Sequence, residues 1–187
     1  MLLFSIILGI AATASAVDII LHNDRDCHTS DGSAIFCTNI NPRMCCTSPV
    51  TQGWMGIGFY GLEKHWVTKG YRQAPPDFSP CARLIEASFS SIYRCMNSDL
   101  YMGGAIDDTF NKRSDNEPIA VEGVVEADGM LVRGKEYTLK GMEKELVEEL
   151  WAHAVNGTDE SDVPDIFKAF EVEAQKVEER KRRWLKG

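Results

Sequence analysis

Several signatures of catalysis and metal binding are missing from this chain of 187 residues. No HExxH, GxSxG or CxxC motif occurs, and the four histidines show no metal-ligand spacing with the cysteines. These absences argue against a zinc site and against common hydrolase families. The formal net charge of -8 argues against a nucleic-acid-binding body. We therefore expect no cofactor, no metal and no catalytic residue, with a hydrolase as an outside alternative.

Long apolar runs are also scarce, and the one near the N-terminus is too short to cross a bilayer. It covers residues 2–10 and is followed by small residues at Ala14 and Ala16, a pattern that precedes signal-peptidase cleavage. We expect residues 1–16 to be a signal peptide and Val17 to become the new N-terminus. The mature protein is then predicted to be secreted and to have no transmembrane segment.

The chain has six cysteines, and none follows Cys95. An even number of cysteines in a secreted protein predicts three disulfides, although the sequence leaves their pairing open. A bond between neighbouring cysteines strains the backbone, so Cys45 and Cys46 are expected to connect one segment to two different places. The six residues are Cys27, Cys37, Cys45, Cys46, Cys81 and Cys95.

Residues 17–112 have the pattern of short strands joined by turns. Gly32, Pro42 and Pro49 punctuate short apolar runs. The segment 54–60 alternates bulky residues with glycine, which is typical of a strand whose glycine face lies against another part of the chain. We expect an antiparallel, sandwich-like β-domain that the disulfides staple.

Residues 113–187 follow a different pattern. A turn at Asp128-Gly129 separates the apolar segments 119–126 and 130–139 and predicts a β-hairpin. Apolar residues at helical spacing then predict amphipathic helices over 142–154 and 162–186, which we expect to form a helical hairpin. The whole chain is thus predicted to be α+β, with a leader at 1–16, a cysteine-rich β-domain at 17–112 and an acidic, cysteine-free region at 113–187.

The negative charge lies almost entirely in the second half. The formal net charge is -1 from Val17 to Arg113 and -7 from Ser114 to the C-terminus. A solvated helical surface accounts for this excess most simply, and an acidic docking surface is the alternative.

The segment 37–46, Cys-Thr-Asn-Ile-Asn-Pro-Arg-Met-Cys-Cys, is the most distinctive stretch of the chain. Together with the flanking segments 20–27 and 55–62, it resembles a group of small secreted cysteine-rich fungal proteins that share a C-x-N-I-x-P-x-x-C-C element. The resemblance covers residues 17–95 and implies a compact, crystallin-like β-domain in an effector-like or cell-surface protein. It implies no metal site, and residues 114–187 have no counterpart in it.

Two motifs allow a functional interpretation but have a simpler one. Residues 56–61 fit GxGxxG, yet a dinucleotide site needs these glycines between a strand and a helix. Here they lie inside a predicted strand. The close carboxylates of Asp24 and Asp26, and of Asp107 and Asp108, are more typical of Asx turns than of a catalytic pair.

Three further sites are candidates for binding or modification. Trp54 and Trp66 could stack on sugars, with core packing as the alternative. Asn156 begins the only N-x-S/T sequon, in a predicted loop, and is therefore a predicted glycosylation site. The dibasic pair Lys112-Arg113 is a possible processing site, with ordinary surface charge as the alternative.

These features together predict a secreted, non-enzymatic, effector-like protein that acts by binding a host or cell-surface partner. One alternative is a protein that binds cell-wall polysaccharide through its aromatic residues. Another is a killer-toxin-like precursor that is cut after Arg113. The sequence leaves the oligomeric state open.

Overall fold

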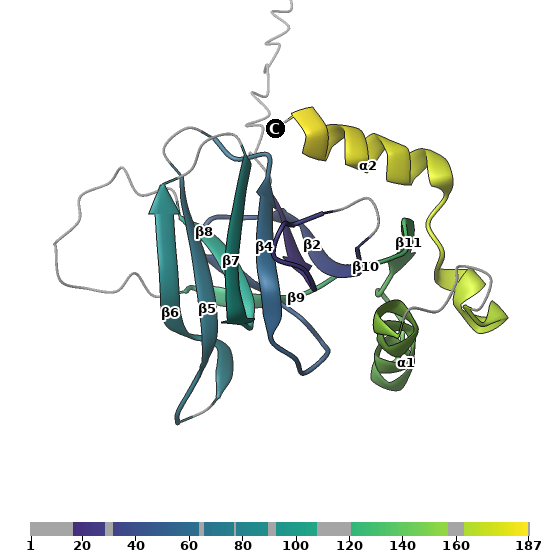
Figure 1. Cartoon of the computed structure of the whole chain (residues 1–187), viewed down its shortest axis with the longest axis horizontal. Helices are drawn as coiled ribbons and strands as arrows, with labels where there is room; N and C mark the ends of the chain where they lie inside the picture. Colours follow the sequence, from purple (N-terminus) through teal and green to yellow (C-terminus); the bar gives the residue numbers. More distant parts are fainter. Residues whose placement is uncertain are drawn as a thin grey trace, which may run out of the picture.

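The computed structural model describes residues 17–28, 32–63, 66–76, 78–89, 93–107, 121–156 and 163–186. This part of the chain contains a six-stranded and a five-stranded sheet, with helices at the C-terminal end of the chain (Figure 1). The predicted mixed α+β class is confirmed. The elements are β1 (Val17–His22), β2 (Ala34–Ile40), β3 (Met44–Thr47), β4 (Trp54–Tyr60), β5 (Val67–Ala74), β6 (Ser79–Phe89), β7 (Tyr93–Tyr101), β8 (Gly103–Asp107), β9 (Gly123–Glu126), β10 (Gly129–Val132), β11 (Lys135–Thr138), α1 (Lys144–Val155), the 3₁₀ helix η2 (Asp165–Phe170) and α2 (Ala174–Lys186).

The six-stranded sheet has the order β11-β10-β2-β1-β4-β7, and its neighbouring strands are antiparallel. All six residues of the central strand β1 are buried, so both faces of this sheet are covered there. Side chains alternate between the faces of a strand. Ile19 and Leu21 belong to the main core, whereas Ile20 belongs to a second cluster on the opposite, outer face.

The five-stranded sheet has the order β6-β5-β8-β3-β9 and packs against the inner face of the six-stranded sheet. Cys46 and Ile106 of this sheet share the main core with Ile19 and Ile57 of the other. The sheets approach closely at Gly104, where a Cβ atom would lie 2.9 Å from Ile57 and 3.2 Å from Ile19. A larger residue at this position would push the sheets apart.

The six cysteines form three disulfides, Cys27–Cys95, Cys37–Cys46 and Cys45–Cys81. As expected, the adjacent cysteines of β3 bond to different segments. Neighbouring residues of a strand face opposite ways, so Cys46 points into the main core and Cys45 into a separate cluster that includes Cys81. The Cys37–Cys46 bond therefore connects the two sheets, while Cys45–Cys81 joins β3 to β6 on the outer side of the five-stranded sheet.

The predicted hairpin at Asp128-Gly129 is wrong, because the strands on its two sides enter different sheets. β9 pairs in parallel with β3, whereas β10 pairs with β2 and β11. The hairpin lies later, where Arg133 and Gly134 connect β10 to β11 with φ values of 49° and 84°. Positive φ at both central residues matches the twist of an antiparallel hairpin, and it divides the segment predicted as one strand over 130–139.

The first predicted helix is confirmed as α1, whose buried residues are Val147, Leu150, Trp151 and Ala154. The second predicted helix is interrupted: η2 ends at Phe170 and α2 begins at Ala174. Between them the chain runs along β11, where the Val172 amide donates a hydrogen bond to the Glu136 carbonyl. Backbone pairing with the edge of β11 therefore replaces the hydrogen bonds of a helix in this segment.

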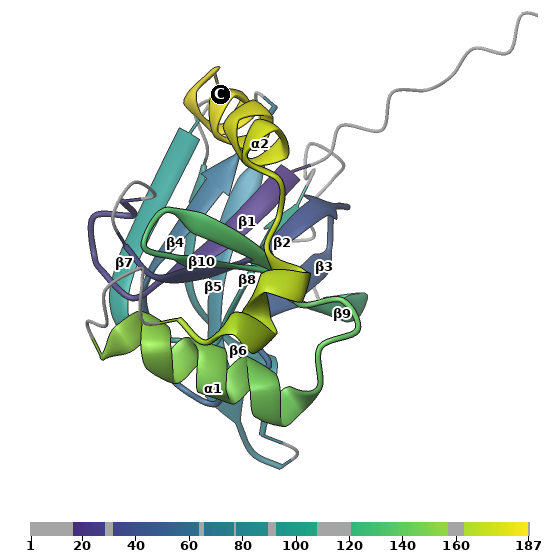
Figure 2. The ribbon, with the colours of Figure 1, turned by 90° about the vertical axis from the view of Figure 1, so that its right-hand side faces the viewer.

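A helical hairpin is not confirmed. The α1 side chains pack in the main core, whereas Trp184 of α2 packs in the cluster on the outer face of the six-stranded sheet. Figure 2 shows α1 and α2 at opposite ends of this side of the molecule, with η2 between them. Among the helices in the described ranges, none has the length and apolar content needed to cross a membrane.

Candidate functional site

The outer face of the six-stranded sheet holds α2 through an aromatic contact. The Trp184 ring lies 5.8 Å from the ring of Phe36 and 5.5 Å from that of Tyr60, between ring centres. Its indole N–H donates a hydrogen bond of 2.8 Å to Asp18 Oδ2 on β1. Trp184 is only 4% exposed and Asp18 only 5%, so α2 covers a carboxylate together with apolar surface.

Charge pairing extends this contact along α2. Arg180 donates a hydrogen bond to Glu136 Oε1 on β11 and lies over the Phe36 ring, 5.1 Å from its centre. Arg183 lies 3.7 Å from Asp18 Oδ2. Cationic residues of α2 therefore meet acidic residues of the sheet, and only Val177 and Trp184 supply its buried apolar contacts among the side chains described for this helix.

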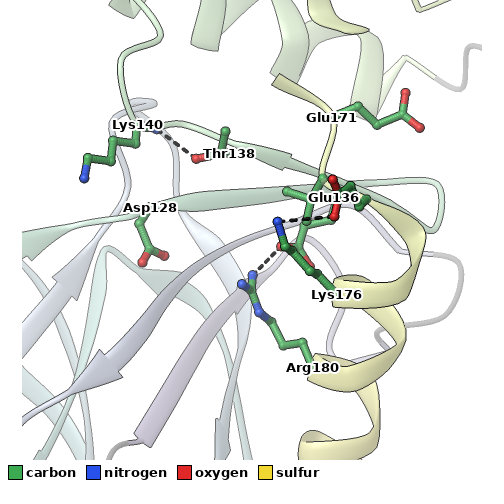
Figure 3. Close-up of a pocket in the computed structure, with 9 residues that line it drawn as sticks. Asp128, Glu136, Thr138, Lys140, Glu171, Lys176 and Arg180 are labelled. Carbon is green, nitrogen blue, oxygen red and sulfur yellow. Dashed lines mark hydrogen bonds and ion pairs between the residues drawn. The ribbon is translucent and has the colours of Figure 1, made fainter. Parts of the chain in front are cut away.

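A pocket of about 440 Å³ lies between the β10–β11 hairpin and α2. Figure 3 shows Lys140 and Asp128 on one side of it and Arg180 reaching toward Glu136 from α2. Its lining contains more acidic than basic side chains. The residues are Asp128, Glu136, Thr138, Lys140, Glu171, Val172, Glu173, Lys176 and Arg180.

Burial disfavours the charged form of two carboxyl groups in this pocket, Glu136 and Asp128. Burial raises the pKa of Glu136, with Arg180 opposing the shift and the charges of Asp128 and Asp18 adding to it. Burial also raises the pKa of Asp128, although both the backbone amide and the hydroxyl of Thr38 donate hydrogen bonds to it. Glu136 is 2% exposed, and its Oε2 atom has no hydrogen-bond partner in the described part of the chain.

A second surface lies along β6, the terminal strand of the five-stranded sheet (Figure 1). In the ranges that the structure describes, β6 pairs with β5 alone, and the residues from Ala82 to Ile85 are all exposed. Four large apolar side chains are exposed on β6 and the turn before it, with exposed fractions of 61% for Phe78, 41% for Leu84, 39% for Ile85 and 68% for Phe89. An exposed strand edge with apolar side chains is a typical protein-binding surface.

Further buried titratable groups lie on β1 and on the five-stranded sheet. His22 is fully buried, neither ring nitrogen has a hydrogen-bond partner in the described residues, and burial lowers its pKa to about 4 against the opposing effect of Asp24. On the other sheet, Lys69 Nζ lies 2.6 Å from Asp107 Oδ2. Burial and the Asp107 charge together raise the pKa of Tyr71 to about 12.

The two tryptophans that were candidates for sugar contact are buried. Trp54 is 0% and Trp66 is 7% exposed, and both belong to the main core. The Trp54 ring packs against Trp151 of α1, with 4.9 Å between ring centres. The sugar-contact interpretation is therefore wrong for these residues, because their faces are covered by other apolar side chains.

The predicted modification and processing sites lie partly or wholly outside the described residues. Asn156 is exposed at the C-terminal end of α1, while the rest of its sequon lies outside the described residues. The leader at 1–16 and the Lys112-Arg113 pair also lie outside them. Asp24 Oδ1 accepts a hydrogen bond from the Asp26 amide, which is the Asx-type arrangement named as the alternative to a carboxylate pair.

The sequence did not single out Asp18, Glu136 or Trp184 as members of one site. Their separation in the chain hides the contact, since Trp184 and Asp18 are 166 positions apart. Asp18 and His22 do show one signal in the sequence. They are the polar residues of an otherwise apolar strand and lie four positions apart, so their side chains share a face.

Two family models match the chain, and they divide it at the turn between β10 and β11. The model ARB_05566_N, described as an N-terminal domain, matches residues 18–131, which is more than half of the chain. The model ARB_05566_C, described as a C-terminal domain, matches residues 133–185. No curated protein and no solved structure matches the chain. The chain therefore belongs to the ARB_05566 family, with the N-terminal domain ending at β10 and the C-terminal domain beginning in the turn that follows.

Proposed function

We propose that the mature chain is an extracellular, effector-like binding protein that captures a host or cell-surface protein along β6. The observation that carries this proposal is the exposed edge of β6 with its apolar side chains. A partner strand can pair with the free backbone groups of such an edge, while neighbouring apolar side chains add affinity. An exposed apolar strand edge promotes aggregation of an isolated protein. A partner that covers β6 would remove this hazard.

Two observations support the extracellular part of this proposal. Three disulfides use all six cysteines, and such bonds persist in oxidising compartments. β1 begins at Val17, so removal of residues 1–16 would leave every described strand complete. The resemblance of residues 17–95 to small secreted fungal proteins points in the same direction.

The test compares the binding of the mature protein and two variants to proteins of a host extract or cell surface. The protein is collected from culture medium, and its N-terminal residue is expected to be Val17. Leu84→Ser with Phe89→Ser removes exposed apolar side chains of β6, and Ile166→Ser is the matched control because Ile166 is exposed elsewhere, at 53%. A partner that the wild type and the control retain should be bound at least about tenfold more weakly by the β6 variant.

Circular dichroism would establish that the β6 variant is folded, as expected for substitutions of exposed side chains. Equal retention of every bound protein by all three forms would contradict a binding role for β6. A protein that keeps Met1 as its N-terminus would contradict the extracellular part of the proposal.

A further inference from the structure

Two arginines lie opposite each other at the free edge of the five-stranded sheet. Arg72 of β5 is the direct antiparallel partner of Arg83 of β6, the terminal strand of this sheet in Figure 1. Directly opposed side chains of neighbouring strands lie close together, and like charges at such positions are destabilising. Within the residues that the structure describes, no hydrogen bond or ion pair engages either guanidinium group. The pair therefore costs stability without compensation from the described part of the chain.

The neighbouring carboxylates serve other groups. Glu86, on the same strand as Arg83, accepts a hydrogen bond of 2.6 Å from the Tyr101 hydroxyl. Asp107 is fully buried, and its Oδ2 atom lies 2.6 Å from Lys69 Nζ. The two arginines thus form a small positive region in a chain whose formal net charge is -8. An acidic group from another molecule would offset their repulsion.

A charged residue on an edge strand can also serve simply to prevent pairing with another copy of the chain. Arg83 suits that purpose, because another copy would bring its own Arg83 to the same edge. That purpose does not account for Arg72, since β5 is paired on both sides, with β6 and with β8. Repulsion from Arg72 favours conformers in which Arg83 leans away from β5, toward the free edge where a partner strand would lie.

We propose that the strand captured by β6 carries an aspartate or glutamate opposite Arg83, so that the ligand is an acidic, extended peptide segment. This inference rests on the binding role proposed above for β6 and names the chemistry of its ligand. A guanidinium group can donate two parallel hydrogen bonds to one carboxylate, which provides both attraction and register. Leu84 is exposed and pairs with Tyr71, so it lies on the opposite face of β6 from Arg83. It would contact an apolar residue next to the acidic one.

Selection from a displayed library of random nonapeptides tests this ligand class on the full mature chain. The wild type should enrich peptides in which one position is fixed as Asp or Glu and has an apolar neighbour. Fluorescence anisotropy then compares the best peptide, with Glu at that position, with its Gln counterpart. The wild type should bind the Glu peptide at least about tenfold more tightly. Arg83→Gln should remove this preference and leave the affinity for the Gln peptide unchanged within about twofold.

Two further variants separate binding from folding. Arg83→Glu places a carboxylate opposite Arg72, so it should raise the urea midpoint of the free protein. The same variant should lose the Glu peptide and prefer the Lys counterpart, because the attraction is reversed. Arg182→Gln is the matched control, since Arg182 is an exposed arginine of α2, and it should keep the full preference for the Glu peptide.

Three results would overturn an acidic peptide ligand while β6 keeps its binding role. One is enrichment of peptides without a fixed acidic position, or of none, and another is an unchanged preference for Glu in Arg83→Gln. The third is binding of heparin that depends on Arg83 when no acidic peptide is enriched, which would assign the arginines to a sulfated polysaccharide. If the selected peptides bind Leu84→Ser with Phe89→Ser as tightly as the wild type, both the acidic ligand and the role of β6 are wrong.

Discussion

Individual side chains in this protein take their roles from the face of the strand on which they lie. Cys45 and Cys46 are neighbours, yet one joins the outer cluster of its sheet and the other joins the main core. The same alternation along β1 places Ile19 and Leu21 in the core and sends Asp18 and His22 to the outer face. On that face Asp18 obtains donors from Trp184 and the Asn39 amide, whereas His22 obtains none among the described residues.

His22 is expected to make the protein sensitive to acid. Its pKa falls from 6.5 to about 4 in the folded protein because burial disfavours the imidazolium form. Above pH 6.5 both states are neutral and no stability is lost, but below it the unfolded chain takes up the proton first. Stability should therefore fall as the pH is lowered from 6.5 to about 4, by about 3 kcal/mol from this group.

Urea denaturation across this pH range, for the wild type and for His22→Gln, measures the effect. The difference between the two curves isolates His22 from Glu136 and Asp128, whose raised pKa values act in the opposite direction. His153→Gln is the matched control, because His153 lies on α1 and is not among the groups that shift the pKa of His22. Parallel wild-type and His22→Gln curves would show that His22 does not carry the acid sensitivity.

At the scale of elements, α2 is a charged helix that depends on the sheet below it. An isolated helix of this length is marginal in water, and its buried side chains in the described part are only Val177 and Trp184. The hydrogen bond from Trp184 to Asp18 and the contact of Arg180 with Glu136 therefore position the helix. The neighbouring segment 171–172 adds backbone bonds to β11, which is why the predicted long helix is broken there.

Trp184→Phe should loosen α2 while keeping the aromatic contact. The variant leaves Asp18 Oδ2 without its indole donor in a buried place, which costs about 1–3 kcal/mol. Hydrogen exchange should become faster in α2 by about tenfold or more, with β1 and β2 less affected.

Asp18→Asn provides the thermodynamic control for this change. Because the neutral amide lowers the penalty for a missing donor, Trp184→Phe should cost less in that background than in the wild type. Equal costs in both backgrounds would mean that the indole–carboxylate hydrogen bond does not hold α2.

At the scale of the whole molecule, both family domains contribute to the main core. Trp54 and Ile57 come from the N-terminal domain, whereas Tyr137, Leu150 and Trp151 come from the C-terminal domain, and all five belong to the same cluster. Trp151 also donates a hydrogen bond of 2.8 Å to the Gln52 side chain. The boundary between the two family domains, at residues 131–133, therefore lies within a hydrogen-bonded hairpin, and residues on both sides of it share the main core. We expect the two domains to unfold together.

Trp151→Ala tests this cooperativity. Loss of a buried tryptophan should lower stability by about 3–5 kcal/mol. The urea midpoints from tryptophan fluorescence and from far-ultraviolet circular dichroism should shift by the same amount, since both report one transition. A shift of the helical signal alone would show that the C-terminal domain unfolds independently.

Features that depend on local pattern could be predicted from the amino-acid sequence. Turn residues predicted that residues 17–112 form short strands, alternation predicted β4 at 54–60, and helical spacing predicted α1 together with its buried face. The adjacency of Cys45 and Cys46 was enough to predict that they bond to different segments, because this follows from geometry within two residues.

The pairing of the strands, the pairing of the cysteines and the position of the charged pocket could not be predicted in this way, because they depend on how distant elements pack. β9 and β10 are neighbours in the chain but enter different sheets, and the Arg133-Gly134 turn became recognisable only from its backbone angles. Asp18, Glu136 and Trp184 meet because the chain folds back over the sheet. Contacts between such distant residues depend on the packing of whole elements, and short sequence patterns carry no information about that packing.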